Sequence, residues 1–299
     1  MIELIRTEIN AHEQALTPHR LSVASMCRLL NVTRAAVYRP HHGQVATQIA
    51  VAESADVRRE IMEVATQMPC YGYRRIVEEV SRRRSKRVNH KQVRRVMHAE
   101  NLVCRRPKRF RVTTDSRHGF AVYPNLAGEM NLTGINQLWV ADITYVRLPK
   151  GFCYLAAILD AFSRRVVGWS LESYLDAELT IAALWTALRT RAVSVALVHH
   201  SDRGVQYACS EDTTLLKEHS IRISMSRCGN PYDNAQAERF MRTLKEEEVY
   251  LSDYDNVTEA RRSIKHFLES VYNHKRLHSA LGYLPPAEFE QSLQQSTSA

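Results

Sequence analysis

The sequence NPYDNAQAERFMRTLK, residues 230–245, decides how the fold of this chain is interpreted. It predicts a helix, because Asn230 is a favourable N-cap and Pro231 suits the first helical position. Residues three and four apart share one face of a helix, so a polar stripe lies beside an apolar stripe. The polar stripe holds Asn234, Glu238, Arg242 and Lys245, and the apolar stripe holds Ala237, Met241 and Leu244. Taken alone, the polar stripe is explained by a solvated face with an ion pair between Glu238 and Arg242.

Two aspartates upstream of Glu238 change that interpretation. Asp202 lies in the sequence HHSDRGVQY, and 35 residues separate it from Glu238. Asp142 lies in the sequence LWVADITY, and 59 residues separate it from Asp202. An aspartate between apolar neighbours in the middle of a strand is costly unless it is paired or binds a metal ion.

Both the spacing and the neighbouring sequences resemble a known family. Two aspartates, then 35 residues, a glutamate, and a base seven residues later form a pattern similar to that of the DDE transposases and retroviral-type integrases. The motifs HSDRGxQY and NPYDNAxxERF resemble those of bacterial insertion-sequence transposases, namely the second reading-frame product (OrfB) of the family named after insertion sequence three. The resemblance covers nearly the whole chain. It implies an α/β fold in which a ribonuclease-H-like integrase core, a mixed sheet flanked by helices, follows all-α helix-turn-helix DNA-binding modules.

Three carboxylates suit metal-dependent DNA chemistry. Two Mg²⁺ ions about 3.5–4 Å apart activate an attacking oxygen and stabilise a leaving oxygen, and Mg²⁺ prefers oxygen ligands. We therefore expect Asp142, Asp202 and Glu238 to be catalytic residues that bind two Mg²⁺ ions, with Mn²⁺ as a substitute. The residues alone imply metal-assisted phosphodiester chemistry. The resemblance adds strand transfer by a freed 3′-OH and a DNA-phosphate contact for Lys245.

The net charge of +9 is concentrated in one block of the chain. Residues 71–111 hold 15 Lys or Arg against 3 Asp or Glu, a net of +12, which predicts double-stranded DNA as the partner. Apolar residues interleaved through the block argue against a disordered basic tail. The candidate DNA contacts are Lys245, Arg242, Arg203, Arg34, Arg74, Arg75, Lys91, Arg94, Arg95, Arg105, Arg106, Lys108 and Arg109. The run Arg82-Arg83-Arg84 is a further candidate for phosphate contacts.

Composition restricts the location and class of the protein. No apolar run approaches the roughly 18 residues of a membrane span, and the first residues lack the apolar core of a signal peptide. The six cysteines are scattered without a Cys-x-x-Cys pair, which suits a reducing compartment. We therefore expect a bacterial cytoplasmic, nucleoid-associated protein with no membrane partner.

The pattern along the chain predicts several parts. Residues 21–39 have helix-turn-helix patterning, although a helical hairpin used for packing explains them equally well. Three strands follow residue 137 as an antiparallel meander, and then helices alternate with two more strands. The expected parts are an N-terminal helix-turn-helix segment (1–50), a basic helical DNA-binding module (51–112), a linker (113–134), the catalytic core (135–250) and a C-terminal helical extension (251–299).

Three further groups could be mistaken for metal ligands. Asp160 is separated from Asp142 by 17 residues and is better explained as a turn residue at a strand end. The pair His41-His42 lacks cysteines at the spacing of a zinc site. His274 and His278 are four apart, but no third ligand is evident, so a capping or DNA-backbone role is favoured.

Two rival functions remain open from the sequence. One is a ribonuclease-H-like nuclease that only cleaves, and the other is a non-enzymatic helix-turn-helix regulator that needs no carboxylate cluster. The resemblance also implies a first-frame (OrfA-type) partner protein, or a frameshifted fusion with it, and a homo-oligomer assembled on DNA. The lack of a heptad run in this chain fits the second-frame product alone.

Overall fold

The computed structural model describes residues 25, 27, 44–102, 121–193, 196–227 and 230–297. The chain divides into two compact units, residues 1–59 and 60–299. The helix-turn-helix predicted for residues 21–39 and the pair His41-His42 lie outside the described residues, as do Arg34, Arg105, Arg106, Lys108 and Arg109. Helix α4 runs over Gln44–Gln67.

The basic module contains two further helices, α5 (Tyr73–Arg84) and α6 (His90–Ala99). Asn89 caps α6, because its side chain accepts a hydrogen bond from the backbone N–H of Lys91. Ile76 and Val80 of α5 and Val93 of α6 are fully buried, and α5 and α6 pack against each other. Burial of one apolar face leaves the opposite face of α6 to its basic side chains.

The first three strands form the predicted antiparallel meander. They are β1 (Leu138–Arg147), β2 (Phe152–Asp160) and β3 (Val166–Glu172), each paired with the next. The turn between β1 and β2 uses Gly151 at a φ of +87°, a region that favours glycine.

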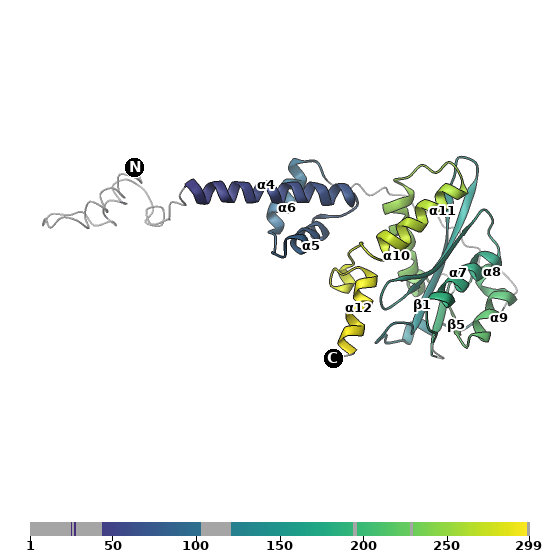
Figure 1. The fold of residues 1–299 in the computed structure, drawn as a ribbon. Coiled ribbons are helices and arrows are strands. Elements are labelled where there is room, and N and C mark those ends of the chain that lie inside the picture. The colour runs from purple at the N-terminus through teal and green to yellow at the C-terminus, as the bar shows by residue number, and fades with distance from the viewer. Residues whose placement is uncertain are drawn as a thin grey trace, which may run out of the picture. The chain divides into compact units, whose positions relative to one another are not determined.

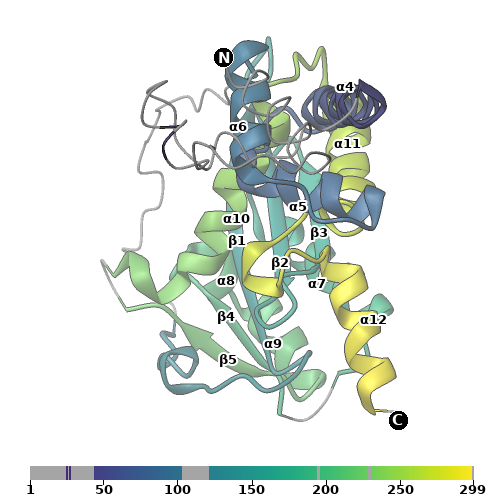
Figure 2. The same cartoon turned by 90° about the vertical axis from the view of Figure 1, so that its left-hand side faces the viewer.

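Two short strands complete a mixed sheet. The strands β4 (Val198–Ser201) and β5 (Arg222–Met225) run parallel to β1, which gives the strand order β3-β2-β1-β4-β5. Figure 2 shows β5 at one edge of this sheet. Because parallel neighbours need crossover connections, helices lie between β3 and β4 and between β4 and β5.

Helices cover both faces of the sheet (Figure 1). Side chains at alternate positions of β1 point to opposite faces: Trp139 packs in a cluster with α7 (Ala177–Thr190) and α9 (Ser210–Glu218), and Val140 packs with α10 (Ala235–Leu244). The short helix α8 (Val205–Ala208) joins the α7 face. Helix α11 (Val257–His266) joins α10 on the other face.

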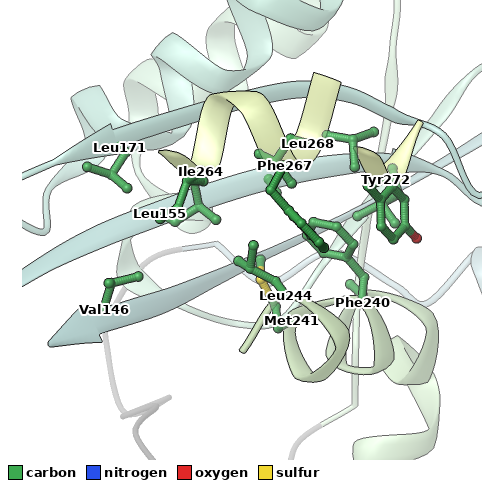
Figure 3. Packing of buried hydrophobic residues seen from close by; sticks show 14 of the residues in the cluster. Val146, Leu155, Leu171, Phe240, Met241, Leu244, Ile264, Phe267, Leu268 and Tyr272 are labelled. Carbon is green, nitrogen blue, oxygen red and sulfur yellow. The ribbon is translucent and has the colours of Figure 1, made fainter. Parts of the chain in front are cut away.

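The α10 face is a dense apolar layer (Figure 3). Phe240, Met241 and Leu244 of α10 meet strand residues such as Leu155, and the rings of Phe240 and Tyr272 pack edge to face with centroids 5.0 Å apart. The predicted apolar stripe of residues 230–245 is therefore confirmed as the buried face of α10.

The start and the end of that helix differ from the prediction. Residues Pro231–Asn234 form a 3₁₀ turn, α10 begins at Ala235, and a π-helical turn spans Lys245–Val249. Asn230 does cap this 3₁₀ turn, accepting from the N–H of Tyr232. Asp233 in this turn accepts hydrogen bonds from the backbone N–H and the guanidinium of Arg227.

The chain on either side of the core is also packed against it. Residues before β1 include a 3₁₀ turn (Ala127–Glu129), whose neighbour Leu126 packs on the α10 cluster and donates its N–H to the Ser224 hydroxyl. After α11 come a π-helical segment (Phe267–Tyr272), a 3₁₀ turn (Ser279–Leu281) and α12 (Pro286–Thr297). In the described part of the chain, no helix has the length and apolarity needed to cross a bilayer.

Candidate active site

The register of β1 against β4 brings two acidic residues to the same level. Leu138, Trp139 and Val140 pair with Val198, His199 and His200 in parallel. Continued by two residues, this register sets Asp142 beside Asp202, which directly follows the last residue of β4. Neighbouring strands lie about 4.8 Å apart. The carboxyl end of β4 therefore meets the middle of β1 at Asp142.

Helix α10 carries the third acid to the same end of the sheet. The side-chain amide of Asn234, just before α10, donates a 2.9 Å hydrogen bond to the carbonyl oxygen of Ala141, which directly precedes Asp142. Glu238 follows Asn234 by four residues, about one helical turn. Its side chain is exposed, whereas Ala237 is buried in the apolar layer.

The three carboxylates interact electrostatically. Burial raises the pKa of Asp142 to about 8, and the negative charges of Asp202 and then Glu238 contribute to this rise. Partial desolvation of the carboxyl by its neighbours and the charge of Asp202 also raise the pKa of Glu238, although its side chain is exposed. Like charges that disfavour one another's ionisation form a site that a cation would stabilise.

The carboxylates are not gathered into a closed ligand set. Among the described residues, no three His, Cys, Asp or Glu side chains are placed so that they could hold a metal ion together. The donor set itself fits Mg²⁺, since it offers only carboxylate oxygens and mutual repulsion.

Lys245 lies against an aromatic ring beside these acids. Its ammonium nitrogen is 4.4 Å from the centroid of the Tyr145 ring, and Tyr145 packs edge to face on Phe152 at 5.5 Å. Burial lowers the pKa of Lys245, and the charge of Asp142 opposes that change. Lys245 therefore supplies a positive charge next to Asp142.

Known proteins match this chain along most of its length. Residues 133–231 and 219–286 match families described as "Integrase core domain", and residues 53–110 match one described as "HTH-like domain". A Shigella sonnei protein named "Insertion element IS600 uncharacterized 31 kDa protein" is 35% identical over 272 residues, 90% of this chain and 99% of its own. "Transposase InsF for insertion sequence IS3A" of Escherichia coli strain K12 is 32% identical over 273 residues, 90% of this chain and 94% of its own.

This chain belongs to the IS3 family of transposases. The solved catalytic core of BIV integrase covers 55% of the chain and 99% of its own length, at 21% identity and a TM-score of 0.42, which is too weak to add to that assignment. The predicted family and the predicted integrase-type mixed sheet behind a helix-turn-helix-like region are confirmed. Because the chain belongs to a transposase family, the alternative of a non-enzymatic helix-turn-helix regulator has no support.

Several predicted DNA contacts of the transposase lie on exposed helix surfaces. Lys91, Arg94 and Arg95 are exposed on α6, and Arg74 is exposed on α5. The guanidinium groups of Arg74 in α5 and Arg94 in α6 each lie 5.4 Å from the centroid of the Tyr73 ring. These side chains form one basic surface of the HTH-like domain.

Other predicted contacts are engaged within the protein. Arg75 pairs with Glu247, Arg203 donates to the carbonyl oxygen of Ser226, and Arg242 pairs with Glu246 rather than with Glu238 as expected. The run of three arginines is engaged likewise, with Arg82 on Glu288, Arg83 on Glu79 and Arg84 on Glu60. Their assignment to DNA stays a prediction that competes with these ion pairs.

The remaining candidate ligands have structural partners. Asp160 is buried and accepts the backbone N–H groups of Asn136, Phe162 and Ser163, as expected of a turn residue. His274 lies on the carbonyl oxygen of Glu269, a contact of the capping kind. His278 lies 3.2 Å from the guanidinium of Arg276, and burial with that charge lowers its pKa to about 2.

Sequence analysis missed three residues around the site: Asn234 as the link to β1, Tyr145 under Lys245, and Glu247 between two arginines. Of these, only Asn234 could have been predicted from the sequence. It lies on the same helix stripe as Glu238, so its side chain has to face either solvent or the strand.

Proposed function

We propose that this IS3-family transposase cleaves DNA at the ends of its insertion sequence and joins the freed 3′-OH to a second phosphodiester, in a reaction that requires Mg²⁺. The observation that carries the proposal is the β1–β4 register, which sets Asp142 level with Asp202, together with the Asn234 bond that fixes α10 beside them. Burial and the neighbouring negative charges that raise the pKa of Asp142 support a cation as a ligand of these acids.

Each group of this chain would have a distinct task. Asp142, Asp202 and Glu238 would hold two Mg²⁺ ions, or Mn²⁺ in their place. When bound, the ions would supply activation of the attacking oxygen and stabilisation of the leaving oxygen. Lys245 would hold a DNA phosphate, as a cation held by the Tyr145 ring beside the acids is suited to do.

The HTH-like domain would bind the element ends. Its exposed bases Lys91, Arg94 and Arg95 lie on the face of α6 that is opposite the buried Val93. Contacts from such side chains to phosphates position a protein on DNA. We further propose that a first-frame (OrfA-type) protein assists end recognition and that several copies of the transposase assemble to bring two ends together.

A strand-transfer assay tests the proposal. Labelled duplexes that carry the element ends are incubated with the transposase and a target plasmid, with Mg²⁺ or with a chelator, and with or without the first-frame protein. We expect Mg²⁺-dependent nicking at the end followed by joining to the plasmid. Nicking without joining would instead support the nuclease that only cleaves, and binding with neither reaction in every combination would refute the proposal.

A further inference from the structure

Glu247 is held between two arginines from distant parts of the chain. It lies in the π-helical turn that continues α10, nine residues after Glu238. Arg276 donates to both of its carboxylate oxygens, from Nε to Oε2 and from Nη2 to Oε1, each at 2.7 Å. Arg75 of α5 also approaches Oε1, at 3.5 Å. The side chains of Arg276 and Glu247 are only 6% and 13% exposed.

The contacts around this pair join the same two segments. The Tyr71 hydroxyl, just before α5, accepts the N–H of Leu277 at 2.8 Å, and Tyr71 is buried. The guanidinium of Arg75 lies 5.3 Å from the Tyr71 ring. The Cys70 thiol donates to the carbonyl oxygen of Glu246 at 3.3 Å. The start of α5 is thus bonded to the turn after α10 and to the segment that carries Arg276.

The hydrogen bonds of this junction fix its geometry. A bidentate arginine–carboxylate pair fixes both distance and orientation, because two parallel hydrogen bonds must be satisfied together. A buried ion pair is weak evidence for stability but can specify one arrangement over others. At this junction the arrangement connects the HTH-like domain to the helix that carries Glu238 near one end and Lys245 at the other.

We infer that Glu247 is a positioning residue that sets which phosphodiester of a bound element end is cut. The inference rests on the proposed function of the carboxylates and of the basic α6 surface. If α5 and α10 are held at a fixed separation through Glu247, the sequence bound by the HTH-like domain determines where the active site falls along the DNA. Loosening the junction should leave end binding intact and make the position of the cut variable.

A role in stability alone makes a different prediction. Glu290 provides a matched control, because it is also buried and pairs with Arg191 and Arg165 at 2.7 Å, neither of which belongs to α5. Loss of either carboxylate removes a buried charge from its arginines and destabilises the fold. Only loss of the Glu247 carboxylate should move the cut.

The experiment maps cuts at nucleotide resolution on a labelled end duplex with Mg²⁺. We expect wild type and Glu290→Gln to cut at one position, and Glu247→Gln to spread cuts over neighbouring phosphodiesters, raising the misplaced fraction at least about tenfold. Arg75→Gln, which removes the weaker and more exposed arm together with the contact of Arg75 with the Tyr71 ring, keeps the test open if Glu247→Gln fails to fold. End binding should stay within about twofold in each variant. Cuts that coincide in all four proteins would overturn the inference.

A second measurement separates this inference from the proposed function. A photocrosslinking amino acid in place of Glu238 reports which nucleotides α10 reaches without any cleavage. One crosslinked nucleotide in the otherwise wild-type protein, spreading to several when Glu247→Gln is added, would sustain the inference even if the transposase did not cut. An unchanged single nucleotide would reject it.

Discussion

The side chain of Asn234 bonds to the backbone of Ala141 across 93 residues of sequence. Asn234 ends the 3₁₀ turn before α10, and Ala141 directly precedes Asp142 in β1. This single bond therefore links the strand and the helix that carry two of the proposed metal ligands. Asn234 is buried, so the bond is shielded from competition with water.

Substitutions at Asn234 should separate alignment from stability. We expect Asn234→Ala to lower the free energy of unfolding by about 1–3 kcal/mol, because it leaves a buried carbonyl unpaired, and to slow cleavage roughly tenfold to a hundredfold through misalignment. Asn234→Asp should be worse once its carboxyl ionises, since it places a carboxylate against a carbonyl oxygen. Denaturant titration and single-turnover cleavage measure both effects.

Asn256 supplies the control for that comparison. It caps α11 by accepting from the N–H of Glu259, so its bond lies within its own helix and does not reach β1. Asn256→Ala should cost about 1 kcal/mol of stability and leave cleavage unchanged. Equal losses of activity in the two variants would show that stability alone accounts for the effect.

Neutralising any one of the three acids should abolish DNA cleavage and joining but leave the binding of element ends intact. Asp142→Asn, Asp202→Asn and Glu238→Gln each keep the side-chain shape but remove a charged metal ligand, so cleavage and joining should fall about a thousandfold or more. End binding, measured by gel shift, should stay within about twofold. Asp212→Asn is the control, a buried carboxyl of α9 with a pKa raised to about 7 by burial. Substantial Mg²⁺-dependent strand transfer by any of the three would remove that residue from the assignment.

The raised pKa of Asp142 predicts how stability depends on pH. Its carboxyl titrates near pH 8 in the folded chain and near 3.8 when unfolded. The unfolded chain thus loses this proton first, so the stability contributed is fully present below pH 4 and is lost as pH rises through 8. Without metal, Asp142→Asn should match wild type near pH 4.5 and exceed it in melting temperature near pH 8.5. Mg²⁺ should raise the melting temperature of wild type alone. Parallel pH profiles for the two proteins in chelator would contradict a half-buried, repelled carboxyl at Asp142 as the cause.

Gly168 of β3 lies where the backbone of α7 packs directly against the sheet. A methyl group at this position would lie 2.3 Å from the carbonyl oxygen of Ala183 and 2.8 Å from the Cβ of Ala187, both in α7. Gly168→Ala should therefore lower the free energy of unfolding by about 1–3 kcal/mol or more. Gly134→Ala, whose nearest contact would be 3.8 Å away on a flexible glutamine, should change it by less than about 0.5 kcal/mol. Denaturant unfolding measures both, and equal effects would mean that α7 shifts freely.

Local pattern was sufficient to predict the antiparallel part of the fold. The three strands after residue 137 were expected as an antiparallel meander, and β1, β2 and β3 pair in that way. The parallel strands β4 and β5 pair with partners far away in the sequence and are four residues each, so nothing local specifies their neighbours. That part of the topology followed only from the resemblance to a family.

The three candidate carboxylates were predicted from their spacing in the sequence. The ion-pair partners of the arginines near them were not predicted. Glu238 and Glu246 both lie four residues from Arg242, so helix geometry alone could not decide between them, and Arg242 bonds to Glu246. Arg75 belongs to a basic block that favours DNA, yet it faces Glu247, 172 residues away. Such partners are set by tertiary packing, which a charge count along the sequence does not contain.

The contact between Lys245 and Tyr145 allows a direct test of the proposal that Lys245 binds a DNA phosphate. The ammonium lies 4.4 Å from the ring centroid, and a cation over an aromatic face is stabilised by about 0.5–2 kcal/mol. Lys245→Ala should weaken end binding and reduce the slope of log affinity against log salt by about one phosphate's share. Lys245→Arg should retain more of the end-binding affinity than Lys245→Ala, although the planar guanidinium presents its donors differently from an ammonium.

Tyr145 allows the position of that charge to be varied without removing it. Tyr145→Phe keeps the aromatic face, so end binding and its salt slope should match wild type. Tyr145→Leu removes the face and should weaken end binding about threefold to tenfold, because the ammonium loses its preferred position but keeps its charge. The salt slope should then stay closer to wild type than in Lys245→Ala, since the phosphate contact is misplaced rather than deleted. Identical affinities and slopes across all four variants would leave Lys245 an ordinary half-buried lysine with no phosphate to hold.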